Sequence, residues 1–254
     1  MKAFRVSSAL AFALLSVASL VAQSNPGTIL QLEFQTPKNG MIPQYEDGRK
    51  QKAAWHKQQN DKTPLLVWEI LSGDNTSTYI VGEPPQHWAD FDKPSIPEDQ
   101  DIAEYNKTVG NYVASMKARF YQLMPKLSNP TNSQLPSKYA EVFIFETRYG
   151  KSADFGSALA RIHDAGVQTK WPPNYEWYHL VNGGPAGEWV LVIPHDNWAG
   201  LEDQPDLKPF RDMIKDAFGQ AEADSIVERI DSSVMSETSQ IIQFRPDLSY
   251  LPGK

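Results

Sequence analysis

Two segments of this 254-residue chain carry the same pattern of side chains at a constant separation. Residues 67–93 align with residues 177–203 at a shift of 110 positions, without gaps. Four residue pairs in this alignment are identical, and aromatic and aliphatic residues also match at the positions around them. Because a repeated folding unit shows its pattern once per copy, the alignment predicts two copies of one unit. The identical pairs are Gly73 and Gly183, Pro84 and Pro194, Trp88 and Trp198, and Ala89 and Ala199.

The spacing of apolar residues predicts the same order of elements in both copies. Each copy begins with an alternating strand, continues with a helix and a pair of strands, and closes with a second helix. In the first copy these elements are predicted at residues 28–35, 44–58, 65–71, 79–81 and 102–123. In the second copy they are predicted at residues 139–148, 155–166, 176–181, 189–193 and 210–230, with a break at Gly219.

The ends of the two copies differ in sequence. A further strand is predicted over residues 239–245, whereas residues 128–137 contain Pro130 and Pro136 and indicate a linker. We therefore place a boundary near Ser137, with a first unit at 23–137 and a second unit at 138–254. Both units have an ordinary domain size.

The predicted order resembles the ferredoxin-like βαββαβ unit. A Trp-Ala pair follows the third predicted strand of each copy, at Trp88-Ala89 and Trp198-Ala199. In this respect residues 28–250 resemble the dimeric α/β-barrel superfamily, which includes antibiotic-biosynthesis-monooxygenase-like and NIPSNAP-like domains. The resemblance implies an α+β fold of two tandem ferredoxin-like units packed as an internal pseudo-dimer. It leaves the function open, because such folds host many chemistries.

The first residues read as a secretory signal peptide at 1–22. Lys2 and Arg5 precede an apolar run over residues 6–21, which is shorter than the roughly 20 residues of a membrane span. Cleavage is expected after Ala22, with Ala18 or Gln23 as alternatives, and a retained N-terminal anchor is the other interpretation. We expect a secreted or periplasmic protein without stable membrane insertion after removal of the signal.

Composition and missing motifs exclude several functions. The formal charge of −7 disfavours nucleic acid as a partner. The absence of cysteine excludes disulfides, thiolate catalysis and cysteine-ligated metals. The sequence contains no nucleophile elbow, phosphate-binding loop, dinucleotide fingerprint or zinc-protease motif. The acidic run at residues 98–101 is read as the start of a helix. We therefore expect no metal and no cofactor.

Three histidines are candidates for chemistry. His56 and His163 align at a shift of 107, with three extra residues of the second copy near 171–173, and could face a cavity between sheet and helix. The alternative is a helix-end histidine that stabilises the helix dipole. His179 is aligned with Glu69, so the two side chains could meet across the interface between the two copies. The carboxylate would then orient the imidazole as a general base. The alternative is that His179 is a polar residue on a solvent-exposed strand face. His163 and His179 are the candidate catalytic residues.

Aromatic side chains near the predicted strand pairs suggest a stacking site for a small apolar or aromatic molecule, with core packing as the alternative. The first functional interpretation is an exported, cofactor-independent protein that binds such a molecule between sheet and helices. The second is a cofactor-independent oxygenase or related small-molecule enzyme. The third is a structural module that binds proteins through its sheet faces. The candidate ligand-binding residues are His56, Trp68, Trp88, Trp177, Tyr178 and Trp198.

Overall fold

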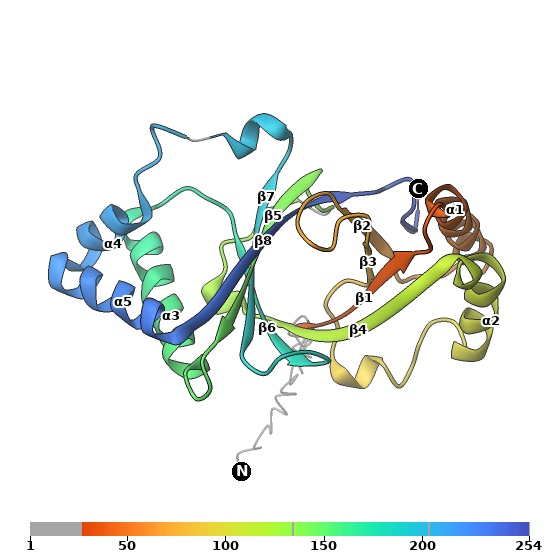
Figure 1. Cartoon of the computed structure of the whole chain (residues 1–254), viewed down its shortest axis with the longest axis horizontal. Helices are drawn as coiled ribbons and strands as arrows, with labels where there is room; N and C mark the ends of the chain where they lie inside the picture. Colours follow the sequence, from red (N-terminus) through yellow and green to blue (C-terminus); the bar gives the residue numbers. More distant parts are fainter. Residues whose placement is uncertain (1–26, 134, 203, 254) are drawn as a thin grey trace, which may run out of the picture.

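The computed structural model describes residues 27–133, 135–202 and 204–253, so the predicted signal peptide lies outside the described residues. Eight antiparallel strands form a closed barrel in the order β1, β3, β2, β8, β5, β7, β6 and β4 (Figure 1). Closure pairs every one of these strands on both sides, so the barrel has no open edge. The strands are β1 (Ile29–Pro37), β2 (Leu66–Ile70), β3 (Tyr79–Gly82), β4 (Val113–Leu123), β5 (Tyr139–Thr147), β6 (Glu176–Asn182), β7 (Glu188–His195) and β8 (Val234–Phe244).

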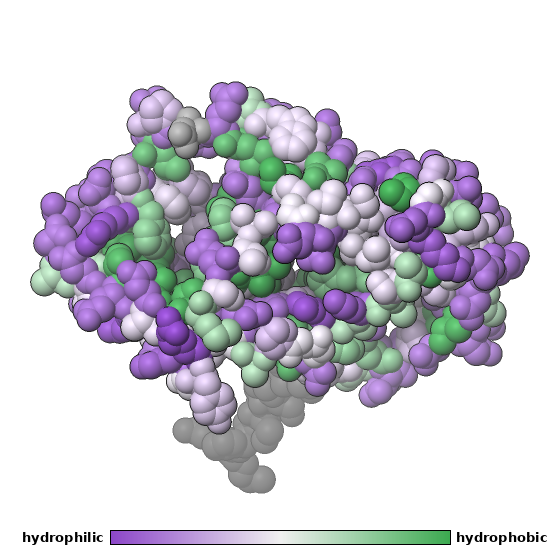
Figure 2. Space-filling model, viewed as in Figure 1, coloured by the Kyte–Doolittle hydropathy of each residue, from purple (hydrophilic) through white to green (hydrophobic). Residues whose placement is uncertain are grey.

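The helices pack outside the barrel at its two ends. Figure 1 shows α1 (Ile42–Gln58) and α2 (Glu98–Thr108) at one end of the molecule. The other end carries α3 (Ser152–Thr169), α4 (Phe210–Phe218) and α5 (Gln220–Ser233). On the face drawn in Figure 2, hydrophilic side chains cover much of the outer surface at both ends. The helices therefore turn polar faces to solvent and their other faces to the sheet.

The two halves of the chain place their elements at equal spacing. β1 and β5 begin at Ile29 and Tyr139, α1 and α3 at Ile42 and Ser152, and β2 and β6 at Leu66 and Glu176, each pair 110 positions apart. In both halves the strands lie in the ferredoxin-like order, β4-β1-β3-β2 and β8-β5-β7-β6. The halves meet where β2 pairs with β8 and β4 pairs with β6. Ile70 lies opposite Ile242 in the first seam, and Leu180 opposite Tyr121 in the second.

The single long helix predicted over residues 102–123 is wrong. The structure has α2, which ends at Thr108, followed by β4 from Val113. β4 pairs with β1 along its whole length and with β6 on its other side. The helical spacing of apolar residues beyond Val109 is overridden by the long-range pairing of β4 with β1 and β6. The break predicted at Gly219 is confirmed, because this residue has a φ of 85° between α4 and α5.

The predicted shift of 107 for the first helices is also wrong. α1 and α3 follow the same shift of 110 as the strands. At that shift the buried Tyr45 corresponds to the buried Phe155. His56 therefore corresponds to Gly166, and the proposed equivalence of His56 with His163 does not hold. No extra residues are needed near 171–173, because β2 and β6 keep the same offset as the helices before them.

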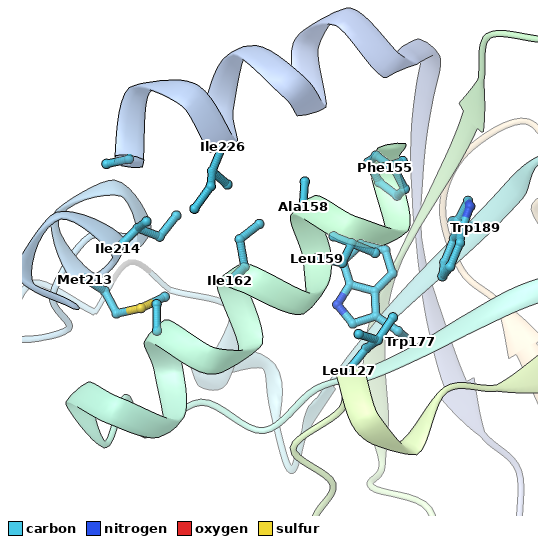
Figure 3. Close-up of a cluster of buried hydrophobic side chains, with 12 residues drawn as sticks. Leu127, Phe155, Ala158, Leu159, Ile162, Trp177, Trp189, Met213, Ile214 and Ile226 are labelled. Atoms are coloured by element: carbon cyan, nitrogen blue, oxygen red, sulfur yellow. The ribbon is translucent and has the colours of Figure 1, made fainter. Parts of the chain in front are cut away.

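Apolar side chains form three separate cores. One fills the barrel and includes Ile70, Tyr121, Leu180 and Ile242. A second lies between the outer face of the barrel and α3, α4 and α5. Figure 3 shows α3 next to Trp177 and Trp189, with α4 and α5 on the other side of α3. The third lies beneath α1 and α2 and is smaller; its buried members are Tyr45, Val67, Tyr79, Val81, Val109 and Leu248.

Candidate active site

The buried face of α1 carries basic side chains where that of α3 is apolar. Arg49, Lys52 and His56 are 2%, 2% and 6% exposed. A polar or charged side chain is costly to bury unless it is paired, so a helix that buries three of them is unusual. At a shift of 110 the corresponding residues of α3 are Leu159, Ile162 and Gly166, all of them buried.

His56 and Asp61 form the centre of this polar region. The His56 Nδ1 and Asp61 Oδ2 atoms are 2.7 Å apart, and both side chains are buried. The other Asp61 oxygen accepts hydrogen bonds from the Ser95 hydroxyl at 2.5 Å and the Thr63 backbone N–H at 2.9 Å. The imidazole also stacks on Tyr250, with ring centroids 5.5 Å apart. These contacts fix both the position and the tilt of the His56 ring.

Asp101 and Lys52 complete the region on the side of α2. Lys52 donates to the Asp101 carboxylate at 2.5 Å and to the Asp101 carbonyl at 3.1 Å. Asp101 lies in the first turn of α2, and its side chain is 39% exposed, so the region reaches solvent there. The lysine also lies over the Trp55 ring, 4.3 Å from its centroid. We call the group Arg49, Lys52, His56, Asp61, Ser95 and Asp101 the α1 polar cluster.

The pKa shifts of His56 and Asp61 indicate which of the two carries a proton. Burial lowers the pKa of His56, and the nearby Lys52 cation acts in the same direction. The hydrogen bonds from Ser95 and Thr63 outweigh burial and lower the pKa of Asp61. Asp61 is therefore a carboxylate that accepts Nδ1–H from a neutral imidazole. His56 Nε2 then carries a lone pair. It is buried without a hydrogen bond, because the Asp101 oxygen 3.4 Å away is also an acceptor.

The lowered pKa of His56 predicts a pH-dependent stability. The unfolded histidine takes up a proton near its ordinary pKa of 6.5, whereas the folded one resists protonation, so stability falls as pH falls from 7 to 5. The lowered pKa of Asp61 places its own loss of stability at more acidic pH. We expect His56→Gln to flatten the dependence by up to about 1.4 kcal/mol per pH unit, measured by urea unfolding. His163→Gln is the control, and equal slopes in wild type and His56→Gln would contradict the assignment.

The other two histidine candidates lack an acidic partner among the described residues. His163 Nδ1 lies 3.2 Å from the Tyr175 hydroxyl. His179 Nε2 lies 3.4 Å from the Ser152 hydroxyl, and burial lowers its pKa. His179 and Glu69 do not meet, because Glu69 lies at the seam of β2 with β8 and His179 at the seam of β4 with β6. Glu69 instead accepts from Arg245 at 2.6 Å. Catalytic roles for His163 and His179 stay predictions.

The predicted aromatic residues do not gather in one place. Trp68 and Tyr178 contribute to the core inside the barrel. Trp177 belongs to the core beneath α3 (Figure 3). Trp88 and Trp198 lie at the surface, 51% and 52% exposed, each in a short turn after the third strand of its half. Of the proposed ligand-binding residues, only His56 lies in the α1 polar cluster.

A second buried polar group lies inside the barrel. Glu188 is 2% exposed, and both of its oxygens accept from Arg119 Nη1 at 2.9 Å. The Tyr121 hydroxyl donates to Glu188 at 2.7 Å, and burial raises the pKa of this tyrosine. The pair joins β4 of the first half to β7 of the second. Sequence reasoning missed it, because its members are 69 positions apart and share no motif.

Two classes of site are not found in the part of the chain that the structure describes. Its His, Asp and Glu side chains form no group of three placed to bind a metal ion. None of its helices combines the length and apolar character needed to cross a membrane.

Comparisons with known proteins identify the fold. No family profile and no curated protein sequence matches this chain. A proposed monooxygenase from Lactobacillus acidophilus is similar in structure, with a TM-score of 0.55 and 11% identity over 89% of this chain and 97% of that one. An anthrone oxidase-like protein has a TM-score of 0.53 and 13% identity over 91% and 95%. The chain therefore has a ferredoxin-like α/β-barrel fold, and at such identities the likeness extends to the fold alone.

Proposed function

We propose that this protein is a small-molecule enzyme in which His56 is the general base. The observation that carries the proposal is the His56 Nε2 lone pair, buried without a partner while Asp61 holds the opposite nitrogen. A base of this kind removes a proton from a phenol or from a C–H bond beside a carbonyl group. Lys52 supplies a positive charge next to the base, which favours the oxyanion that forms.

The oxidant in this proposal is dioxygen, and no cofactor takes part. The fold shared with the anthrone oxidase-like protein supports anthrone as a first test substrate. His56 would take a proton from the CH₂ group of anthrone, leaving a resonance-stabilised enolate that dioxygen can oxidise. Overall, one anthrone and one O₂ give one anthraquinone and one water, so atoms and electrons balance.

Access to the site is proposed to run through α2. This helix spans 11 residues and buries only Thr108, whereas the matching side of the barrel is covered by the buried faces of α4 and α5. Segments with few buried contacts open more readily than the rest of a fold. Opening of α2 would move Asp101 away from Lys52 and uncover His56.

Activity should depend on His56. Anthrone oxidation, followed as O₂ consumption and anthraquinone absorbance, is expected to fall about 10²- to 10⁴-fold in His56→Gln. Anaerobic exchange of the anthrone CH₂ protons with D₂O, followed by NMR, tests the base step without oxidation. His163→Gln is the matched control on α3. Wild-type protein no faster than buffer on anthrone and a panel of quinols, or full activity in His56→Gln, would reject the proposal.

We propose that the two halves descend from one duplicated unit, supported by the common spacing of 110 positions and the matched seams. We also propose that the protein is exported through its N-terminal signal.

A further inference from the structure

Arg49 is a buried cation without a partner. It is 2% exposed, and its guanidinium makes no hydrogen bond or ion pair with any residue that the structure describes. Its Nε atom is fully enclosed and unpaired. Arginine stays protonated at all ordinary pH values, so Arg49 cannot escape this cost by losing its proton.

No neighbouring side chain among the described residues pairs directly with Arg49. Arg49 acts electrostatically on the Tyr45 and Tyr105 hydroxyls and on the Lys52 ammonium. Lys52 repels it, and neither tyrosine bonds to it: the Tyr45 hydroxyl donates to Gln35 instead. The Glu33 carboxylate acts on the same two tyrosines, and one of its oxygens accepts a hydrogen bond from Gln35 at 2.6 Å. Leu159 at the corresponding position of α3 shows that an aliphatic residue is compatible with this place in the fold.

We propose that Arg49 binds the carboxylate of a small organic acid. A guanidinium presents two parallel N–H groups that match the two oxygens of a carboxylate. Lys52 already has a partner in Asp101, and Asp61 is held by His56, whereas Arg49 forms no ion pair with any carboxylate of the described residues. The nearby carboxylates of Glu33 and Asp101 oppose a ligand of charge −2, such as phosphate, more strongly than a singly charged acid.

The position of Arg49 defines the substrate class further. Arg49 and His56 lie seven residues apart on the buried face of α1, a rise of about 10 Å along the helix. The substrate would carry its carboxylate about two helical turns from the proton that His56 removes. This extension to the substrate rests on the proposed function, whereas the carboxylate site itself does not.

Benzoate binding tests the site directly. Calorimetric titration of the full chain with sodium benzoate is expected to show saturable binding, and neutral benzamide is expected to bind much more weakly. Arg49→Leu, which introduces the residue found in α3, is expected to weaken benzoate binding roughly 10- to 100-fold. The same variant is expected to melt at a higher temperature without ligand, because it removes an unpaired buried charge.

Two further variants separate this proposal from the previous one. Arg49→Lys keeps the charge but loses the two-pronged geometry, so its benzoate affinity should fall between those of wild type and Arg49→Leu. His56→Gln should still bind benzoate. Benzoate binding without oxidation of either anthrone or a carboxylated anthrone would leave the carboxylate site standing and reject the enzymatic proposal. Failure of wild type to bind benzoate, or equal affinity in wild type and Arg49→Leu, would overturn the carboxylate site.

Discussion

Arg119→Met is expected to destabilise the protein by about 3–5 kcal/mol, because it leaves the Glu188 carboxylate buried and unpaired. Arg119 is the only cation that contacts Glu188 among the described residues. The remaining donor, the Tyr121 hydroxyl, cannot neutralise a charge. Urea unfolding monitored by tryptophan fluorescence measures the loss.

A double replacement shows whether the missing partner is the cause. Arg119→Met combined with Glu188→Leu removes both charges and should recover most of the stability, because an apolar pair is compatible with the barrel core. Lys151→Met breaks the exposed ion pair with Asp154 and should cost less than about 1 kcal/mol. A loss in Arg119→Met no greater than in Lys151→Met would show that the barrel pair contributes little.

Asp61→Asn is expected to lower the turnover of the proposed reaction about 10²- to 10⁴-fold, with little change in KM. The asparagine oxygen can still accept from Ser95 and Thr63, so its amide nitrogen would face His56. That nitrogen is a donor, so Nδ1 would become the acceptor and the imidazole proton would move to Nε2. The base would then have no lone pair for the substrate.

The pH profile distinguishes this tautomer effect from a loss of structure. In wild type kcat/KM should rise with pH and level off below the ordinary histidine pKa of 6.5, because burial lowers the pKa of His56. In Asp61→Asn activity should stay low at every pH. Asp164→Asn on α3, an exposed acidic residue, is the control. Turnover within twofold of wild type in Asp61→Asn would remove Asp61 from the mechanism.

The repeated spacing made much of the fold predictable. Most strands and the first helix of each half lie close to their predicted positions, because turn residues and alternating apolar residues report local structure. The error over residues 102–123 arose where the choice between helix and strand depends on pairing with β1. Sequence alone carries no direct signal for such a partner.

The candidate site was predictable only in part. Lys52 and His56 lie four positions apart in the helix predicted over residues 44–58, and therefore on one face of it, and this spacing was the available signal. His56 was selected through a false equivalence with His163. Asp61, Ser95 and Asp101 come from three separate connections or helix starts, and only the folded chain brings them to α1. The unpaired state of Arg49 has no counterpart in the sequence.

Because both barrel seams join parts of one polypeptide, each position of this chain exists once. In an assembly of two identical chains, every substitution is present twice, so a buried charge would lower the stability of both chains. Here one side can retain a tightly packed aliphatic interior that maintains the architecture, while the opposite side accumulates unfavourable polar groups. Joining the two halves in one chain therefore allows one half to carry a polar site while the other carries only an apolar core, which two identical chains cannot do.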